Sequence, residues 1–113
     1  ATIITLRPKP AHVAAQAEPA NATAFARIEN HFFVHEGWLT EGQLLAGIDA
    51  IRDIPTVIVQ GRYDMCTPMM TAWDLHRAWP EAEFVIVDDA GHAATEPGLQ
   101  AALVAATDGF AHV

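Results

Sequence analysis

The sequence of 113 residues contains no serine and only one cysteine. Because a single cysteine has no partner within the chain, Cys66 excludes an internal disulfide and favours a reducing compartment such as the cytoplasm. No apolar run approaches the roughly 20 residues that a helix needs to span a bilayer. The first residues also lack a charged-then-apolar secretion signal. We therefore expect a cytoplasmic protein that does not enter the membrane.

Basic residues are scarce as well. Six lysines and arginines stand against 14 acidic residues, and the formal net charge is −8. Arg7 and Lys9 are the only close basic pair, so the chain has no cluster that could neutralise a row of phosphates. We expect neither nucleic acid nor an anionic membrane among its partners. Apolar residues make up 51% of the chain, which is enough material for a core.

The first half of the chain predicts helices. Residues 1–22 contain three prolines without a clear period, and we expect them to be irregular. Residues 22–31 predict a helix, because apolar positions recur at spacings of three and four, at Phe25, Ile28 and Phe32. A second helix is expected over residues 40–54. Thr40 and Gln43 would form its capping box, and Leu44, Leu45, Ile48 and Ile51 would line one face.

The second half of the chain predicts strands that alternate with helices. Residues 56–61 and 83–89 are short β-branched runs of the kind found in strands buried on both faces. A helix capped by Thr67 lies between them, and a last helix follows. One side of the middle helix carries residues expected to pack inward: Met69, Ala72, Trp73, His76 and Trp79. The pattern predicts an α/β fold with parallel strands. Two such strands are not a stable sheet, so a partner chain or the rest of a longer protein must supply more.

Two polar residues follow the two predicted strands. Asp64 comes within four residues of the first strand, and His92 comes within four residues of Asp88, at the end of the second. Because the carboxyl ends of neighbouring parallel strands meet at one edge of the sheet, we expect both side chains at the same edge. An acid followed by a histidine is the second half of a Ser–Asp–His triad in an α/β hydrolase. Gly61 and Gly91 would allow the tight turns that aim them. Taken singly, an aspartate there is often a turn residue.

Several motifs make this interpretation more specific: GRYD, CTP, AWDLHRAWPEA, AGHAATEPG and ATDGFA, with ARIENHFF upstream. Together they resemble the carboxyl-terminal part of the proline iminopeptidases, serine peptidases of the α/β-hydrolase fold that remove an N-terminal proline. The resemblance covers nearly the whole chain. It implies that Asp64 is the triad acid and His92 the base. It also implies that residues 1–53 end a helical cap and that residues 54–113 end the catalytic domain.

This resemblance makes the absence of serine informative. The family's Gly-x-Ser-x-Gly nucleophile motif lies far upstream, and Cys66 could not replace a nucleophile that a different strand positions. We expect the chain to be a carboxyl-terminal fragment that is inactive alone. Cutting the sheet there would expose a strand edge and an apolar face around Val57, Val59, Val85 and Val87, so the isolated chain is expected to self-associate.

Glu29 is the third candidate site residue. On a helix, its neighbours are Phe25, Phe32 and Phe33, and none of them could pair with a buried carboxylate. One interpretation is that the helix ends near Glu29 and the side chain reaches water. The other is that the carboxylate receives a cation. The resemblance favours the second, because the matching family glutamate binds the free amine of the substrate proline.

The remaining polar residues give weaker indications of a functional site. His31 and His35 have helical metal-ligand spacing but no third ligand, and we predict neither a metal nor a cofactor. Arg62 and Tyr63 would fix a turn. Asp88, Asp89 and Glu96 would form a solvated rim.

Two rival functions remain open. The chain could come from another α/β hydrolase, such as an esterase or an epoxide hydrolase. It could also be a non-catalytic binding module in which Asp64 and His92 are relics.

Overall fold

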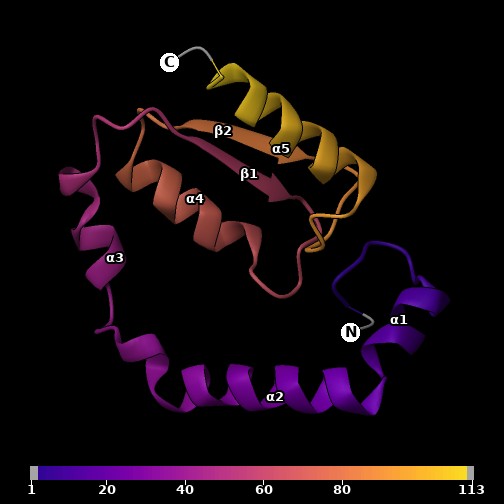
Figure 1. Cartoon of the computed structure of the whole chain (residues 1–113). Coiled ribbons are helices and arrows are strands. Elements are labelled where there is room, and N and C mark those ends of the chain that lie inside the picture. Colours follow the sequence, from indigo (N-terminus) through magenta and orange to yellow (C-terminus); the bar gives the residue numbers. More distant parts are fainter. Residues whose placement is uncertain (1–2, 112–113) are drawn as a thin grey trace.

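The computed structural model describes residues 3–111, in which five α-helices accompany a two-stranded parallel sheet (Figure 1). In chain order the elements are α1 (Pro10–Gln16), α2 (Pro19–Val34), α3 (Gln43–Ala46), β1 (Val57–Gly61), α4 (Met69–Ala78), β2 (Glu83–Val87) and α5 (Pro97–Gly109). Short 3-10 turns lie at Glu36–Trp38 and Ile48–Ala50. The prediction of a strand–helix–strand–helix unit at the carboxyl end is confirmed.

The sheet is covered on both faces. β1 and β2 pair in parallel register from Val57 opposite Glu83 to Gly61 opposite Val87, and α4 and α5 lie on opposite sides of them (Figure 1). Successive residues of a strand point to opposite faces. Ile58 accordingly packs on the α4 side with Ile48, Trp79 and Ala82. Val59 packs on the α5 side with Val87, Ala90 and Leu99. Both strands keep one unpaired edge within the described residues.

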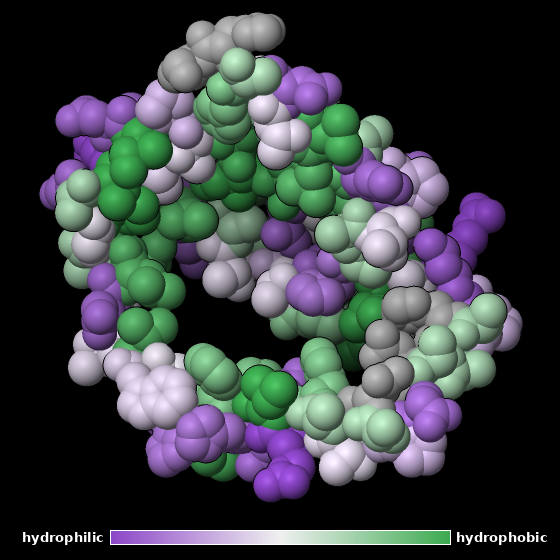
Figure 2. Space-filling view, in the orientation of Figure 1, coloured by the Kyte–Doolittle hydropathy of each residue, from purple (hydrophilic) through white to green (hydrophobic). Residues whose placement is uncertain are grey.

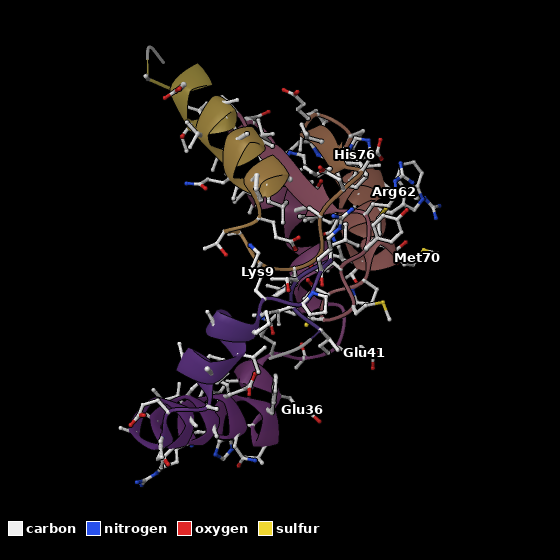
Figure 3. All side chains as sticks on the ribbon, turned by 90° about the vertical axis from the view of Figure 1, so that its right-hand side faces the viewer. Lys9, Glu36, Glu41, Arg62, Met70 and His76 are labelled. Carbon is white, nitrogen blue, oxygen red and sulfur yellow. The ribbon has the colours of Figure 1, made fainter. Side chains whose placement is uncertain are left out.

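Residues 10–38, which include α1 and α2, form a helical arm that lies apart from the sheet (Figure 1). In Figure 1, α2 runs along the bottom of the molecule, below α4 and the sheet, and Figure 2 shows the molecule hollowed between this arm and the α/β part. Viewed from the side, Glu36 lies on the arm, whereas Arg62, Met70 and His76 lie on the α/β part (Figure 3). Much of the apolar surface of α2 is exposed: Phe25, Ile28, Phe32, Phe33 and Val34. Within residues 3–111, no helix has the length and apolar character that crossing a membrane requires.

The expectation of an irregular start is wrong for half of residues 1–22. α1 and the first turn of α2 lie there, and each has a proline at its first position, Pro10 or Pro19. Proline is well suited to that position because its missing N–H would have no helical partner anyway. The prolines that suggested a loop therefore mark helix starts. Residues 1 and 2 lie outside the described part of the chain.

The helix expected over residues 40–54 is also wrong in its extent. α3 has four residues and is followed by a single 3-10 turn. Gly42 adopts a left-handed φ of 74° at the start, and Gly47 lies where the helix would continue, at a cost of about 1 kcal/mol relative to alanine. Part of the capping box does form, because the Gln43 side-chain oxygen accepts the Thr40 N–H at 3.1 Å.

The two tryptophans of the α4 region have different roles. Trp79 is buried, and its indole N–H donates to the Arg52 carbonyl at 3.0 Å, as expected of a core residue. Trp73 is 44% exposed, and its ring centroid lies 6.3 Å from that of Phe84. The core placement predicted for Trp73 is therefore wrong, because helical spacing alone does not show how far a neighbouring element extends.

Candidate active site

The end of β1 and the loop that follows β2 touch at two glycines. A side chain on Gly61 would place its Cβ only 2.0 Å from the Gly91 carbonyl oxygen, and one on Gly91 would meet the Glu96 carboxylate at 3.0 Å. Neither glycine has a left-handed φ, so the tight-turn explanation is wrong. Glycine is needed here because the end of β1 and the loop that follows β2 approach backbone to backbone.

Asp64 lies in the loop that follows β1 and is buried, with 8% of its surface exposed. Its Oδ1 accepts the backbone N–H groups of Cys66 at 2.8 Å and Thr67 at 2.9 Å. Its Oδ2 accepts the Thr67 hydroxyl at 2.8 Å and lies 2.9 Å from His92 Nδ1. Burial by itself would raise the pKa of Asp64, but the hydrogen bonds from Thr67, His92 and Cys66 outweigh it and lower that pKa below 3.8. Asp64 is therefore ionised at neutral pH.

His92 meets Asp64 as the strand-end argument predicted. Its side chain is 41% exposed, and its backbone N–H donates to the Ile4 carbonyl at 2.9 Å. Since the ionised Asp64 accepts a hydrogen bond from the Nδ1–H group, the other ring nitrogen, Nε2, is free to take up a proton. An oriented imidazole with one free basic nitrogen can serve as a general base.

A cavity of about 470 Å³ connects His92 with the helical arm. Its walls come from both halves of the molecule: Ile3, Ile4, Ala22, Phe25, Glu29, Cys66 and His92. Glu29 lies within α2, which continues to Val34, so the interpretation that the helix ends near Glu29 is wrong. The carboxylate is nevertheless exposed, and it faces the same cavity as the histidine. A groove of about 740 Å³ along α2 includes neither Asp64 nor His92.

Two residues near the dyad have contacts that sequence reasoning missed. Thr67 was expected to cap α4, but Pro68 occupies that position and the Thr67 hydroxyl binds Asp64 instead. Glu96 was expected on a solvated rim, and that prediction is wrong, because Glu96 is 5% exposed. Asp88 and Asp89 are exposed, as expected. The available signal was a polar residue directly before a proline at or next to a helix start, Thr–Pro in one loop and Glu–Pro in the other.

The turn after β1 is fixed as predicted. The N–H groups of Arg62 and Tyr63 donate to Val87 and Ala90 at 3.0 Å each. The Arg62 guanidinium also pairs with the Asp88 carboxylate at 2.6 Å. These contacts tie the turn after β1 to the end of β2.

Asp64, Cys66 and His92 could present three metal-ligand atoms within 4.8 Å of one another. The Asp64 carboxylate already accepts four hydrogen bonds, which use about all the acceptor positions that its two oxygens offer. We therefore attribute the grouping to hydrogen bonding. His31 and His35, with ring centroids 4.9 Å apart, pack against Trp38 on the arm and do not line the His92 cavity.

Comparison with known proteins agrees with this geometry. A family model of the alpha/beta hydrolase fold matches residues 4–98. The chain therefore belongs to the α/β-hydrolase family, of which it contains part of the fold.

Within that family, the chain is similar to proline iminopeptidases. It is 56% identical to the proline iminopeptidase of Arabidopsis thaliana over 104 residues, which is 91% of this chain and 27% of the relative. Identity is 57% over 91 residues to the enzyme of Xanthomonas citri, covering 80% and 29% of the two chains. It is 57% over 86 residues to that of Neisseria gonorrhoeae, covering 75% and 27%. The chain thus spans between a quarter and a third of the length of these relatives.

The hydroxyl of Thr67 offers a test of the Asp64 environment. We expect Thr67→Val to raise the pKa of Asp64, because one donor to the ionised form is lost. At pH 7 the variant should lose about 1.5–3 kcal/mol of unfolding free energy, as for a hydrogen bond to a charged group. Since the folded pKa is depressed, this stabilisation is present above pH 3.8 and disappears as the pH falls through the folded value. Denaturant unfolding at several pH values measures this loss of unfolding free energy.

Thr67→Ser is the control, because it keeps the hydroxyl and should behave like wild type. An equal loss in both variants at pH 7 would contradict the assignment.

Proposed function

We propose that this chain supplies the acid and the base of the catalytic triad of a proline iminopeptidase, which releases N-terminal proline from peptides. The observation that carries the proposal is the 2.9 Å contact between Asp64 Oδ2 and His92 Nδ1, at the carboxyl ends of two parallel strands. The names of the relatives support the choice of peptidase over other hydrolases.

The proposed reaction is acyl transfer through a serine. His92 Nε2 removes the proton of a serine hydroxyl, whose oxygen attacks the carbonyl carbon of the proline residue. The protonated imidazole then gives its proton to the nitrogen of the leaving peptide as the C–N bond breaks. Water, deprotonated by His92, hydrolyses the acyl-enzyme. Asp64 stays ionised throughout, holds the ring in one tautomer and stabilises the imidazolium.

The serine must come from outside this chain, because the sequence contains none. We propose that residues 1–53 belong to the helical cap and that residues 54–113 belong to the catalytic domain of a longer enzyme. The unpaired edges of the sheet are where further strands would pair. The chain by itself would then have no peptidase activity.

Glu29 is our candidate for the anchor of the substrate amine. An exopeptidase must distinguish an N-terminal residue from an internal one, and the charged α-amine is the feature that differs. Glu29 and His92 line the same cavity from opposite halves of the molecule, so a short substrate could reach both. The exposed carboxylate can accept a charge-assisted hydrogen bond from an ammonium group.

Glu29→Gln in the full-length enzyme tests this role. We expect kcat/KM for a proline arylamide to fall about 10- to 150-fold, because a hydrogen bond to a charged group contributes about 1.5–3 kcal/mol. Hydrolysis of an ester without an amine should stay within twofold. Glu36→Gln, on the arm but not among the residues that line the cavity, is the matched control.

An equal loss on both substrates would show that Glu29 supports the fold only. A wild-type enzyme that cleaves the simple ester but not the proline arylamide would favour the esterase alternative.

A further inference from the structure

Glu96 is a buried carboxylate that the proposed mechanism does not use. Only 5% of its surface is exposed, and it occupies the N-cap position of α5. The ion pairs among residues 3–111 involve other carboxylates. Burial of a charge without a cationic partner is costly unless hydrogen bonds replace its hydration, so its hydrogen-bond partners indicate what the position requires.

Those partners are backbone N–H groups in the loop that carries His92 and in the amino-terminal segment. Glu96 Oε1 accepts the N–H of Gly91, the residue before the histidine, at 2.8 Å. The N–H of Leu6 lies 3.1 Å from each carboxylate oxygen. The same amino-terminal segment completes the arrangement, since the Ile4 carbonyl accepts the N–H groups of His92 and Ala93 at 2.9 and 2.7 Å. Glu96 thus ties the loop before the histidine to the segment that holds the histidine itself.

We propose that Glu96 is a positioning residue for His92: its carboxylate bridges Gly91 and Leu6 and thereby sets where the imidazole stands relative to the serine. This inference rests on the proposed hydrolytic function. General-base transfer requires heavy atoms about 2.6–3.2 Å apart, and a misplacement of about 1 Å can cost roughly 100-fold in rate. The Asp64 contact orients the ring, whereas the Glu96 bridge fixes the backbone that carries it.

The proposed role of Glu96 depends on the length of its side chain more than on its charge. One oxygen, Oε1, receives both N–H groups, so a glutamine oxygen in its place could keep the bridge. An aspartate side chain is one methylene shorter. It would withdraw the carboxylate from two backbone N–H groups that cannot follow it. Aspartate is nonetheless a favoured N-cap residue and retains the negative charge at the helix start, so Glu96→Asp should preserve α5.

The test uses the full-length enzyme with two readouts: kcat and KM on a proline arylamide, and the rate at which a fluorophosphonate labels the serine. We expect Glu96→Asp to lower kcat and the labelling rate by 10- to 100-fold with KM within twofold. Glu96→Gln should remain within threefold of wild type. Glu18 is the matched control, because it also stands at a helix N-cap directly before a proline and makes no side-chain cap bond, but it is exposed. Glu18→Asp should change neither readout.

A folded Glu96→Asp variant that labels within twofold of wild type would overturn the proposal, as would a Glu96→Gln variant slower than Glu96→Asp. If Glu96→Asp does not fold, amide exchange in the wild-type enzyme decides. The Gly91 and Leu6 amides should be protected, and exchange as fast as at the exposed Gly42 would refute the bridge.

The positioning role and the peptidase assignment can be refuted separately. Phosphonate labelling that follows the predicted order, without proline-arylamide cleavage, would refute the peptidase assignment and leave the positioning role intact.

Discussion

Replacing His92 by alanine in the full-length enzyme is expected to lower kcat for a proline arylamide by at least about 10⁴-fold. The imidazole is the group whose free nitrogen can take the serine proton, and alanine leaves nothing in its place. Asp64 would retain its contacts with Cys66 and Thr67, so the fold around the site should survive. Steady-state kinetics with circular dichroism on the same sample make the measurement.

His35→Ala is the control for this experiment. His35 follows α2 on the arm and stacks on Trp38, with ring centroids 5.3 Å apart, and it does not line the His92 cavity. Its kcat should remain within twofold of wild type. Near-normal activity in a folded His92→Ala variant would refute the triad assignment and favour the interpretation of a non-catalytic module with relic residues.

Asp64→Asn should cost about 10⁴-fold in kcat, although the substitution is nearly isosteric. Oδ1 must remain an acceptor for the N–H groups of Cys66 and Thr67, so the new amide nitrogen has to take the position of Oδ2. An N–H group would then point at His92 Nδ1 and hold the imidazole in the tautomer whose Nε2 already carries a proton. Such a ring cannot accept the serine proton.

The loss in Asp64→Asn should appear in kcat with KM nearly unchanged, because no substrate contact is altered. Asp74→Asn, at an exposed position of α4, should leave both parameters within twofold. A kcat within tenfold of wild type for Asp64→Asn would show that His92 does not depend on Asp64 for its tautomer.

The carboxyl-terminal half could be predicted from the sequence because its signals are local. β-branched runs between helical segments predicted β1 and β2, and the rule that parallel strands end at one edge predicted that Asp64 and His92 meet. Their roles as acid and base, and that of Glu29, remain predictions. For Glu29 only the family resemblance pointed to an amine, since no local pattern shows that α2 shares a cavity with His92.

Two of the features that escaped prediction depend on partners distant in the chain. Glu96 looks like a surface acid because its partners are the backbone N–H groups of Gly91 and the distant Leu6, and an amide group gives no sequence signal. Gly61 looks like a turn residue because the carbonyl that excludes a Cβ belongs to Gly91. Thr67 has the pattern of a helix cap, but its hydroxyl binds Asp64, where it satisfies a buried charge.

The bridge from Glu96 to Leu6 has a consequence for the order in which the site assembles. Asp64 and His92 are 28 residues apart, whereas Leu6 and Glu96 are 90 apart. Closing the longer loop costs about 1 kcal/mol more in chain entropy, and contacts of long sequence separation tend to form late. The dyad can therefore meet inside the β1–α4–β2 unit before the amino-terminal segment returns to hold the histidine loop. A change that loosens the amino-terminal segment would then free the histidine loop while the sheet stays folded, and faster amide exchange at Gly91 would report it.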